Sequence, residues 1–82
     1  MSRTLSNLLA SIPDETGRNE VLELGRQVHQ AGGFGQDAGK DDAEQRRLLE
    51  TMGERIRWHF RAARYAVPRA DELERMIDEH FR

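Results

Sequence analysis

The sequence predicts an all-α fold, a small bundle of three to four helices with a long third helix and a Gly-rich loop between the second and third. Apolar residues recur at the three- and four-residue spacing of amphipathic helices in four stretches, and no stretch alternates like a strand. In addition, a length of 82 residues suits one domain. We therefore expect a single helical domain over residues 1–82.

The first two helices are predicted over residues 4–12 and 16–31. The first carries apolar residues at i, i+3, i+4 and i+7, namely Leu5, Leu8, Leu9 and Ile12. Pro13 ends this pattern, and Asp14 and Thr16 are candidate N-caps for the second helix. The stripe of the second helix consists of Val21, Leu24, Gly25 and Val28, with Leu22 at its edge.

The Gly-rich loop is predicted over residues 32–40 and the third helix over 42–65. The loop lacks the first glycine and the final serine or threonine of a phosphate-binding loop, so we interpret it as a connection. Phe34 within it either folds back onto the core or is offered to a partner. The third helix opens with Asp41 and Glu44 in capping-box spacing. Its inward residues are predicted to be Leu48, Leu49, Met52, Ile56, Phe60 and Ala63.

The fourth helix is predicted over residues 69–81. Pro68 interrupts the third helix, because proline is favoured in the first turn of a helix and disfavoured in its interior. Asp71 and Glu72 complement the dipole of the first turn. The apolar side of this helix consists of Leu73, Met76, Ile77 and Phe81.

A repeat on the third helix has two interpretations. Five positions follow the 3-4 spacing of a coiled-coil seam: Leu49, Met52, Ile56, His59 and Ala63. The stripe either packs against an antiparallel second helix within one chain, or it forms the seam of a homodimer. Both interpretations stay open at this point, because every packed helix carries a similar stripe.

Residue patterns for catalysis, metal binding and membrane insertion are missing from the sequence. The chain has no cysteine, no nucleophile-elbow motif, and no His-x-x-x-His or Glu-x-x-His pair that would hold a metal on one helix. No apolar run approaches the roughly 18 to 20 residues of a membrane span, and the N-terminus lacks signal-peptide features. We therefore expect a cytoplasmic protein that is not an enzyme, with no metal and no cofactor.

Charge is distributed unevenly in this chain, whose formal net charge is −2. From Arg46 to Arg69 there are seven arginines and two acidic residues, whereas the remainder has 6 basic and 13 acidic residues. One side of the third helix is predicted to be basic and aromatic, with Arg57, Trp58, Arg61, Arg64 and Tyr65. Such residues are enriched at binding hot spots and at single-stranded nucleic-acid surfaces.

Three interpretations of this basic face are open. Acidic residues of the fourth helix cover it, or a protein binds it, or a nucleic acid binds it. The negative net charge and the lack of a helix-turn-helix pattern favour a protein over a nucleic acid. We therefore predict an interaction module of the adaptor or inhibitor type that binds a protein partner through this face and Phe34. A nucleic-acid-binding regulator that uses the same arginines is the alternative.

Overall fold

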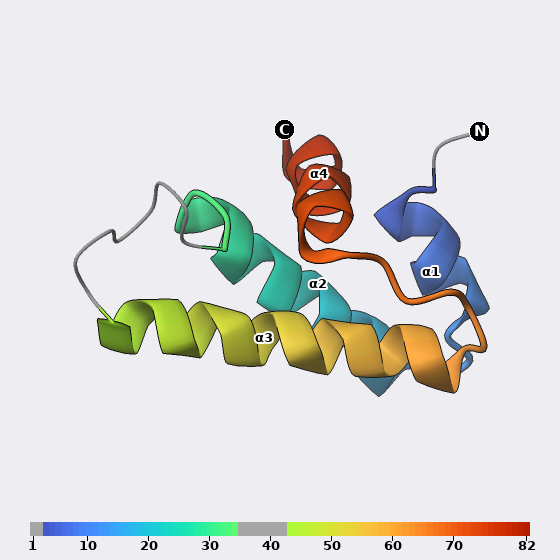
Figure 1. The fold of residues 1–82 in the computed structure, drawn as a ribbon. Helices are drawn as coiled ribbons and strands as arrows, with labels where there is room; N and C mark the ends of the chain where they lie inside the picture. Colours follow the sequence, from blue (N-terminus) through green and yellow to red (C-terminus); the bar gives the residue numbers. More distant parts are fainter. Residues whose placement is uncertain (1–2, 35–42) are drawn as a thin grey trace.

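The four predicted helices form an all-α bundle. The structure is a computed structural model that describes residues 3–34 and 43–82. Its helices are α1 (Leu5–Ser11), α2 (Glu15–Gln30), α3 (Ala43–Ala62) and α4 (Ala70–Phe81). Figure 1 shows α3 running along α2 in the opposite direction, while α4 packs on α2 and lies beside α1. The predicted fold class is confirmed, and α3 is the longest of these helices, with 20 residues.

The core is built from the predicted apolar stripes. Its buried hydrophobic residues are Leu5, Leu8, Ile12, Val21, Val28, Leu49, Ile56, Phe60, Leu73, Met76 and Ile77. One predicted core residue is wrong, because Leu48 is 50% exposed. Successive residues of a helix are separated by about 100° around its axis, so α3 turns Leu49 toward α2 and Leu48 toward solvent. The apolar stripe of α3 is therefore narrower than predicted.

Side-chain caps fix the starts of the first two helices. Asp14 is the N-cap of α2, as predicted, and its carboxylate accepts a hydrogen bond from the Gly17 N–H at 3.0 Å. Thr4 caps α1 in a reciprocal arrangement with Asn7, whose side chain bonds back to the Thr4 N–H. Because Thr4 and Asn7 satisfy backbone groups at the N-terminus of α1, they help a helix of only 7 residues to form.

The third helix ends three residues earlier than predicted. After Ala62 the chain turns, and Arg64 adopts a left-handed backbone conformation with φ of 63°. The Tyr65 N–H then donates to the Phe60 carbonyl at 2.9 Å, and the Arg64 N–H donates to the Arg61 carbonyl at 3.1 Å. These two bonds define a Schellman motif, which satisfies carbonyls at the end of the helix and stops it.

The connection before α3 is described only in part. Residues 35–42, which include Asp41 of the predicted capping box and most of the predicted loop 32–40, lie outside the described residues. Phe34 is partly buried and packs against the core. Of the two interpretations of Phe34, folding back onto the core is therefore the one that the structure adopts.

The coiled-coil spacing on α3 is used inside one chain. Leu49, Ile56 and His59 are buried, and Met52 and Ala63 are partly buried against the core. The main packing contact of α3 is with α2. In this single chain the stripe contributes to the chain's own core, and its use as a homodimeric seam stays a prediction.

Candidate protein-binding surface

The residues predicted for the basic face of α3 divide into two groups. Arg57 turns toward the connection between α3 and α4, and its side chain is only 19% exposed. Its guanidinium pairs with Glu54, and its Nε donates a hydrogen bond to the Pro68 carbonyl at 3.3 Å. Arg57 therefore holds the α3–α4 connection in place. The other four residues of the predicted face are exposed: Trp58, Arg61, Arg64 and Tyr65.

Phe34 lies with Arg57 and away from Trp58. It shares the lining of a small pocket with Arg57 and Gly53. Its backbone N–H donates a hydrogen bond to Glu74 Oε1 on α4 at 2.7 Å. Phe34 thus anchors the chain just after α2, and the structure does not bring it together with the Trp58 group.

Trp58 is half exposed although its orientation is fixed by two neighbours. It is the only tryptophan in the chain, and 48% of its surface is accessible. The Arg55 guanidinium carbon lies 4.5 Å from the indole centroid, within cation–π range. The His59 ring meets the indole edge-on, with the ring centroids 5.0 Å apart. A large aromatic surface is therefore presented to solvent in a defined position.

Glu20 on α2 holds both neighbours of Trp58. Its Oε1 lies 2.7 Å from His59 Nε2 and 2.6 Å from Arg55 Nε. Hydrogen bonds from His59 and then from Arg55 lower the pKa of Glu20 below its ordinary value of 4.5. A carboxylate accepts hydrogen bonds only, so the His59 ring donates through Nε2. Glu20 therefore couples the α2–α3 interface to the exposed indole.

A cleft of about 490 Å³ opens beside Trp58, between the α1–α2 connection and the C-terminal part of α3. Its apolar lining includes Ile12, Pro13, Ala62 and Ala63. Arg64 lines the same cleft and is exposed. The cleft thus offers an apolar recess with an aromatic wall and a cation, a combination that can receive an apolar side chain next to an acidic one.

We call this region the Trp58 surface, which consists of the cleft and the exposed residues Arg55, Trp58, Arg61, Arg64 and Tyr65. Tyr65 is 38% exposed, and its hydroxyl donates to the Asn7 carbonyl on α1 at 3.4 Å. Within residues 3–34 and 43–82, Arg61 and Arg64 form no ion pair. The Trp58 surface therefore carries two cations that the described part of the fold does not neutralise.

The fourth helix does not cover these arginines. Its acidic side chains have other partners: Glu72 pairs with Arg3, Asp78 with His29 and Arg82, and Glu79 with Arg75. The reason is geometric, because α4 makes its main packing contacts with α2 and α1. The interpretation in which acidic residues of the fourth helix neutralise the basic face therefore does not describe this structure.

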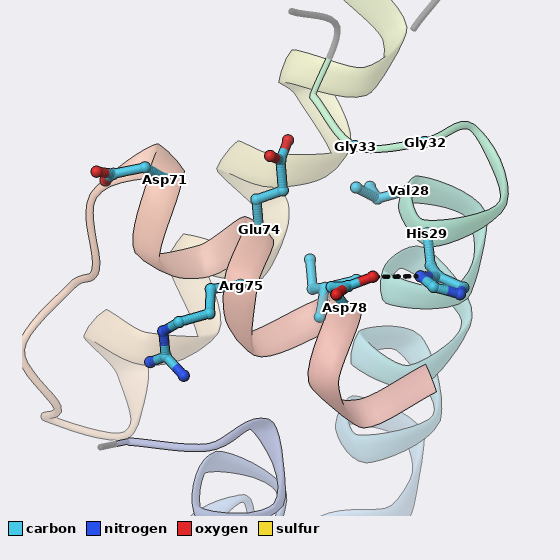
Figure 2. Close-up of a pocket in the computed structure, with 9 residues that line it drawn as sticks. Val28, His29, Gly32, Gly33, Asp71, Glu74, Arg75 and Asp78 are labelled. Atoms are coloured by element: carbon cyan, nitrogen blue, oxygen red, sulfur yellow. Dashed lines mark ion pairs between the residues drawn. The ribbon is translucent and has the colours of Figure 1, made fainter. Parts of the chain in front are cut away.

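A second groove, of about 500 Å³, lies between α4 and the C-terminal end of α2. Figure 2 shows Asp71, Glu74 and Asp78 along α4, with Asp78 directed toward His29 and Arg75 directed away. The Asp78 carboxylate lies 3.6 Å from His29 Nδ1. In the described ranges, no group of three or more histidine, aspartate and glutamate side chains has an arrangement that could hold a metal. This groove gives the molecule an acidic side that is distinct from the Trp58 surface.

Two residues of the Trp58 region are absent from the prediction made on the sequence. Arg55 precedes Trp58 by three residues, a spacing that places both on one side of a helix, so the sequence contains a usable signal for Arg55. Glu20 is 39 positions away from His59 and reaches it only because α2 packs on α3. No local pattern could have indicated Glu20.

Comparison with protein-family models, with curated proteins and with solved structures gave no significant match. In the described ranges, no helix combines the length and apolar character needed to cross a membrane.

Proposed function

We propose that this chain is a non-enzymatic interaction module, of the adaptor or inhibitor type, that binds a protein partner through the Trp58 surface. One observation carries the proposal. The only tryptophan of the chain, Trp58, is half exposed and lines a cleft with apolar residues. Arg61 and Arg64, which belong to the same surface, form no ion pair in the described ranges. Arg57 and Phe34 contribute to the fold, so the proposal rests on the remaining predicted residues together with Arg55.

The exposed indole supports the proposal energetically. Burying apolar surface stabilises a complex by about 25 cal/mol per Å², and an indole is among the largest surfaces that a side chain can offer. Arg55 and His59 already contact the indole, so the Trp58 side chain would lose little conformational entropy when a partner binds it. Oriented tryptophan and arginine at the centre of a surface are typical of interface hot spots.

The charges near the cleft favour a protein over a nucleic acid. Arg55 and Arg57 are engaged by Glu20 and Glu54, so among the residues that the structure describes, Arg61 and Arg64 are the cations close to Trp58 that form no ion pair. A nucleic-acid backbone presents a continuous row of phosphates and is bound by extended basic surfaces. Arg64 at the cleft, with Arg61 three residues before it, fits a short acidic segment better.

The Glu20–His59 pair has the composition of an acid–base pair, but its arrangement supports a positioning role. His59 is 6% exposed, its Nε2 is occupied by Glu20, and Glu20 is also bound to Arg55. A general base needs a nitrogen or oxygen within reach of a substrate proton. We therefore propose that the Glu20–His59 pair holds Trp58 and Arg55 in position and is not catalytic.

The experiment is a comparative capture with the full chain from nuclease-treated extracts of the source cells. The test variant is R61E/R64E, and the matched control is R26E/R69E, which reverses two exposed arginines outside the Trp58 surface. We expect proteins that are retained by wild type and by the control but lost from the test variant, with helicity unchanged by circular dichroism. Identical protein lists for all three chains would refute the proposal.

Oligonucleotide binding decides the alternative. We expect no retention of single- or double-stranded oligonucleotides at low salt. Retention that falls steeply as salt rises, and that is lost in R61E/R64E but not in R26E/R69E, would instead assign the same arginines to a nucleic-acid-binding regulator.

A further inference from the structure

The helices α2 and α3 end in the same backbone motif but carry different residues at its central position. At the end of α2, the Gly33 N–H donates to the Val28 carbonyl and the Gly32 N–H donates to the His29 carbonyl, both at 3.0 Å. Gly32 there has a left-handed φ of 87°. At the end of α3, Arg64 takes the place of Gly32 in the same pair of hydrogen bonds.

The fold gives no reason for an arginine at this position. Glycine is favoured in the left-handed conformation because it has no Cβ to collide with the backbone, and an L side chain there is unfavourable. Arg64 is exposed and forms no ion pair with any residue of the described ranges. The left-handed backbone nevertheless places its side chain at the cleft beside Trp58.

The other charged groups at the cleft already have partners. On α2, Asp14 caps the Gly17 N–H and Glu20 binds His59 and Arg55. On α3, the Arg55 guanidinium is shared between Glu20 and the Trp58 ring. Both acids lie toward the α2 side, where they would repel a further carboxylate. An incoming acidic group is therefore favoured at Arg64 and at Arg61, one turn beyond Trp58.

We infer that Arg64 selects the partner: it receives the carboxylate of an aspartate or glutamate in an acidic segment, while a neighbouring apolar side chain of that segment enters the cleft between Pro13 and Trp58. This inference rests on the proposed function and names the chemistry of the partner. The positive charge of Arg64 favours an acidic residue in the partner segment. The apolar residues that line the cleft favour an apolar residue next to it. An arginine fork suits a carboxylate because it can donate two parallel hydrogen bonds.

The test is a parallel selection of a displayed library of random peptides on four forms of the full chain. These are wild type, Arg64→Gly, Trp58→Ala, and Arg69→Gly as the matched control. Arg69 is an exposed arginine at the N-cap of α4, a position that tolerates glycine, and it does not line the cleft. The affinities of synthetic peptides from the enriched set for all four forms are then measured by isothermal titration calorimetry, with the acidic residue changed to its amide as a further comparison.

We expect wild type and Arg69→Gly to enrich peptides that carry an aspartate or glutamate next to an apolar residue. Their affinity falls by about tenfold or more in Arg64→Gly, in Trp58→Ala and on amidation, since a charge-assisted hydrogen bond or a buried anchor is lost. The melting temperature of Arg64→Gly rises by roughly 2 to 8 °C, because the left-handed position is relieved. Weaker binding by a more stable chain is not expected of a purely structural residue.

Several outcomes would overturn the inference. These are enrichment of peptides without acidic residues, equal binding by wild type and Arg64→Gly, no peptides enriched on wild type relative to Arg64→Gly, or a lower melting temperature for Arg64→Gly. Failure of the proposed function is distinguished by the capture experiment. If R61E/R64E loses a cellular protein but the peptide selection fails, the surface binds proteins by a different chemistry. If the capture is unchanged, the Trp58 surface is not the binding site.

Discussion

The Oε1 atom of Glu20 on α2 lies 2.7 Å from Nε2 of His59 on α3, and this contact joins the two helices beneath the exposed indole of Trp58. His59 is 6% exposed, whereas the Glu20 side chain is 37% exposed. The hydrogen bond therefore joins a buried imidazole to a carboxylate that stays in contact with water. It satisfies His59 without placing a charge deep in the core.

Replacing Glu20 with glutamine should lower the free energy of unfolding at neutral pH by about 0.5 to 1 kcal/mol, a value kept small by solvent screening. The loss should depend on pH with a definite sign. His59 and Arg55 depress the pKa of Glu20 in the folded chain below 4.5, so the stabilisation is full above the unfolded-state pKa. It is lost as pH falls through the folded-state pKa. Urea unfolding of wild type and variant from pH 7 to pH 3 measures this difference.

Glu23→Gln is the matched control for this prediction. Glu23 lies on the same helix, its side chain is 49% exposed, and its ion pair is with Arg26, three residues away. Such a surface pair contributes little, so Glu23→Gln should stay within about 0.5 kcal/mol of wild type. Two results would contradict the proposed role of the Glu20–His59 contact. One is an equal loss of unfolding free energy in Glu20→Gln and Glu23→Gln at pH 7. The other is a loss in Glu20→Gln that is as large at pH 3 as at pH 7.

Trp58 should contribute little to folding for so large a residue. Its indole is 48% exposed, whereas Phe60, two residues later, is 1% exposed. We expect Trp58→Ala to cost about 1 kcal/mol or less, mainly from the lost stack with Arg55. Phe60→Ala should cost about 3 to 5 kcal/mol or unfold the chain. Chemical denaturation followed by far-ultraviolet circular dichroism compares them, and similar losses would mean that Trp58 is part of the core.

Arg64→Gly and Arg61→Gly should change stability in opposite directions. Arg64 has a left-handed φ of 63°, so glycine there should stabilise the chain by about 0.5 to 1 kcal/mol. Arg61 lies in the last turn of α3, where glycine should destabilise it by up to about 1 kcal/mol. Both substitutions remove one exposed arginine, so the net charge changes equally. Thermal unfolding of the pair isolates the backbone effect, and shifts of the same sign would argue against it.

The sequence was sufficient for features that depend on local periodicity. The spacing of Leu5 and Leu8, of Val21 and Val28, and of the other apolar residues predicts four helices, because burial of one helical face requires that repeat. The end of α3 could not be predicted, since Arg64 is not a residue that favours the left-handed conformation.

The candidate site was predictable only in part. Helical spacing correctly predicts exposed Trp58 and Arg61, because both lie away from the apolar stripe. Helical spacing also predicts Arg57 on this surface. In the structure the Arg57 side chain instead pairs with Glu54 and donates a hydrogen bond to the Pro68 carbonyl in the α3–α4 connection. The contribution of Glu20 arises from tertiary packing, which no periodicity within one helix can reveal.

Gly53 and Phe34 should be energetically coupled. A Cβ atom built on Gly53 would lie 2.8 Å from Phe34 Cε1, closer than van der Waals contact permits, so the aromatic ring would have to move. Alanine is otherwise favoured over glycine inside a helix by about 1 kcal/mol. We therefore expect Gly53→Ala to be neutral or destabilising in the wild-type chain. In a Phe34→Ala background the collision is absent, and the same substitution should stabilise by about 1 kcal/mol.

A double-mutant cycle of urea unfolding measures this coupling, with Gly25→Ala as the control substitution. Gly25 faces Phe81 on α4 instead of Phe34, so its effect should be the same with and without the Phe34 ring. Additive effects of Gly53→Ala and Phe34→Ala would mean that the ring does not rest on α3. A coupling of about 1 kcal/mol or more, confined to Gly53, would show that Phe34 is fixed against α3 in solution and is not free to contact a partner.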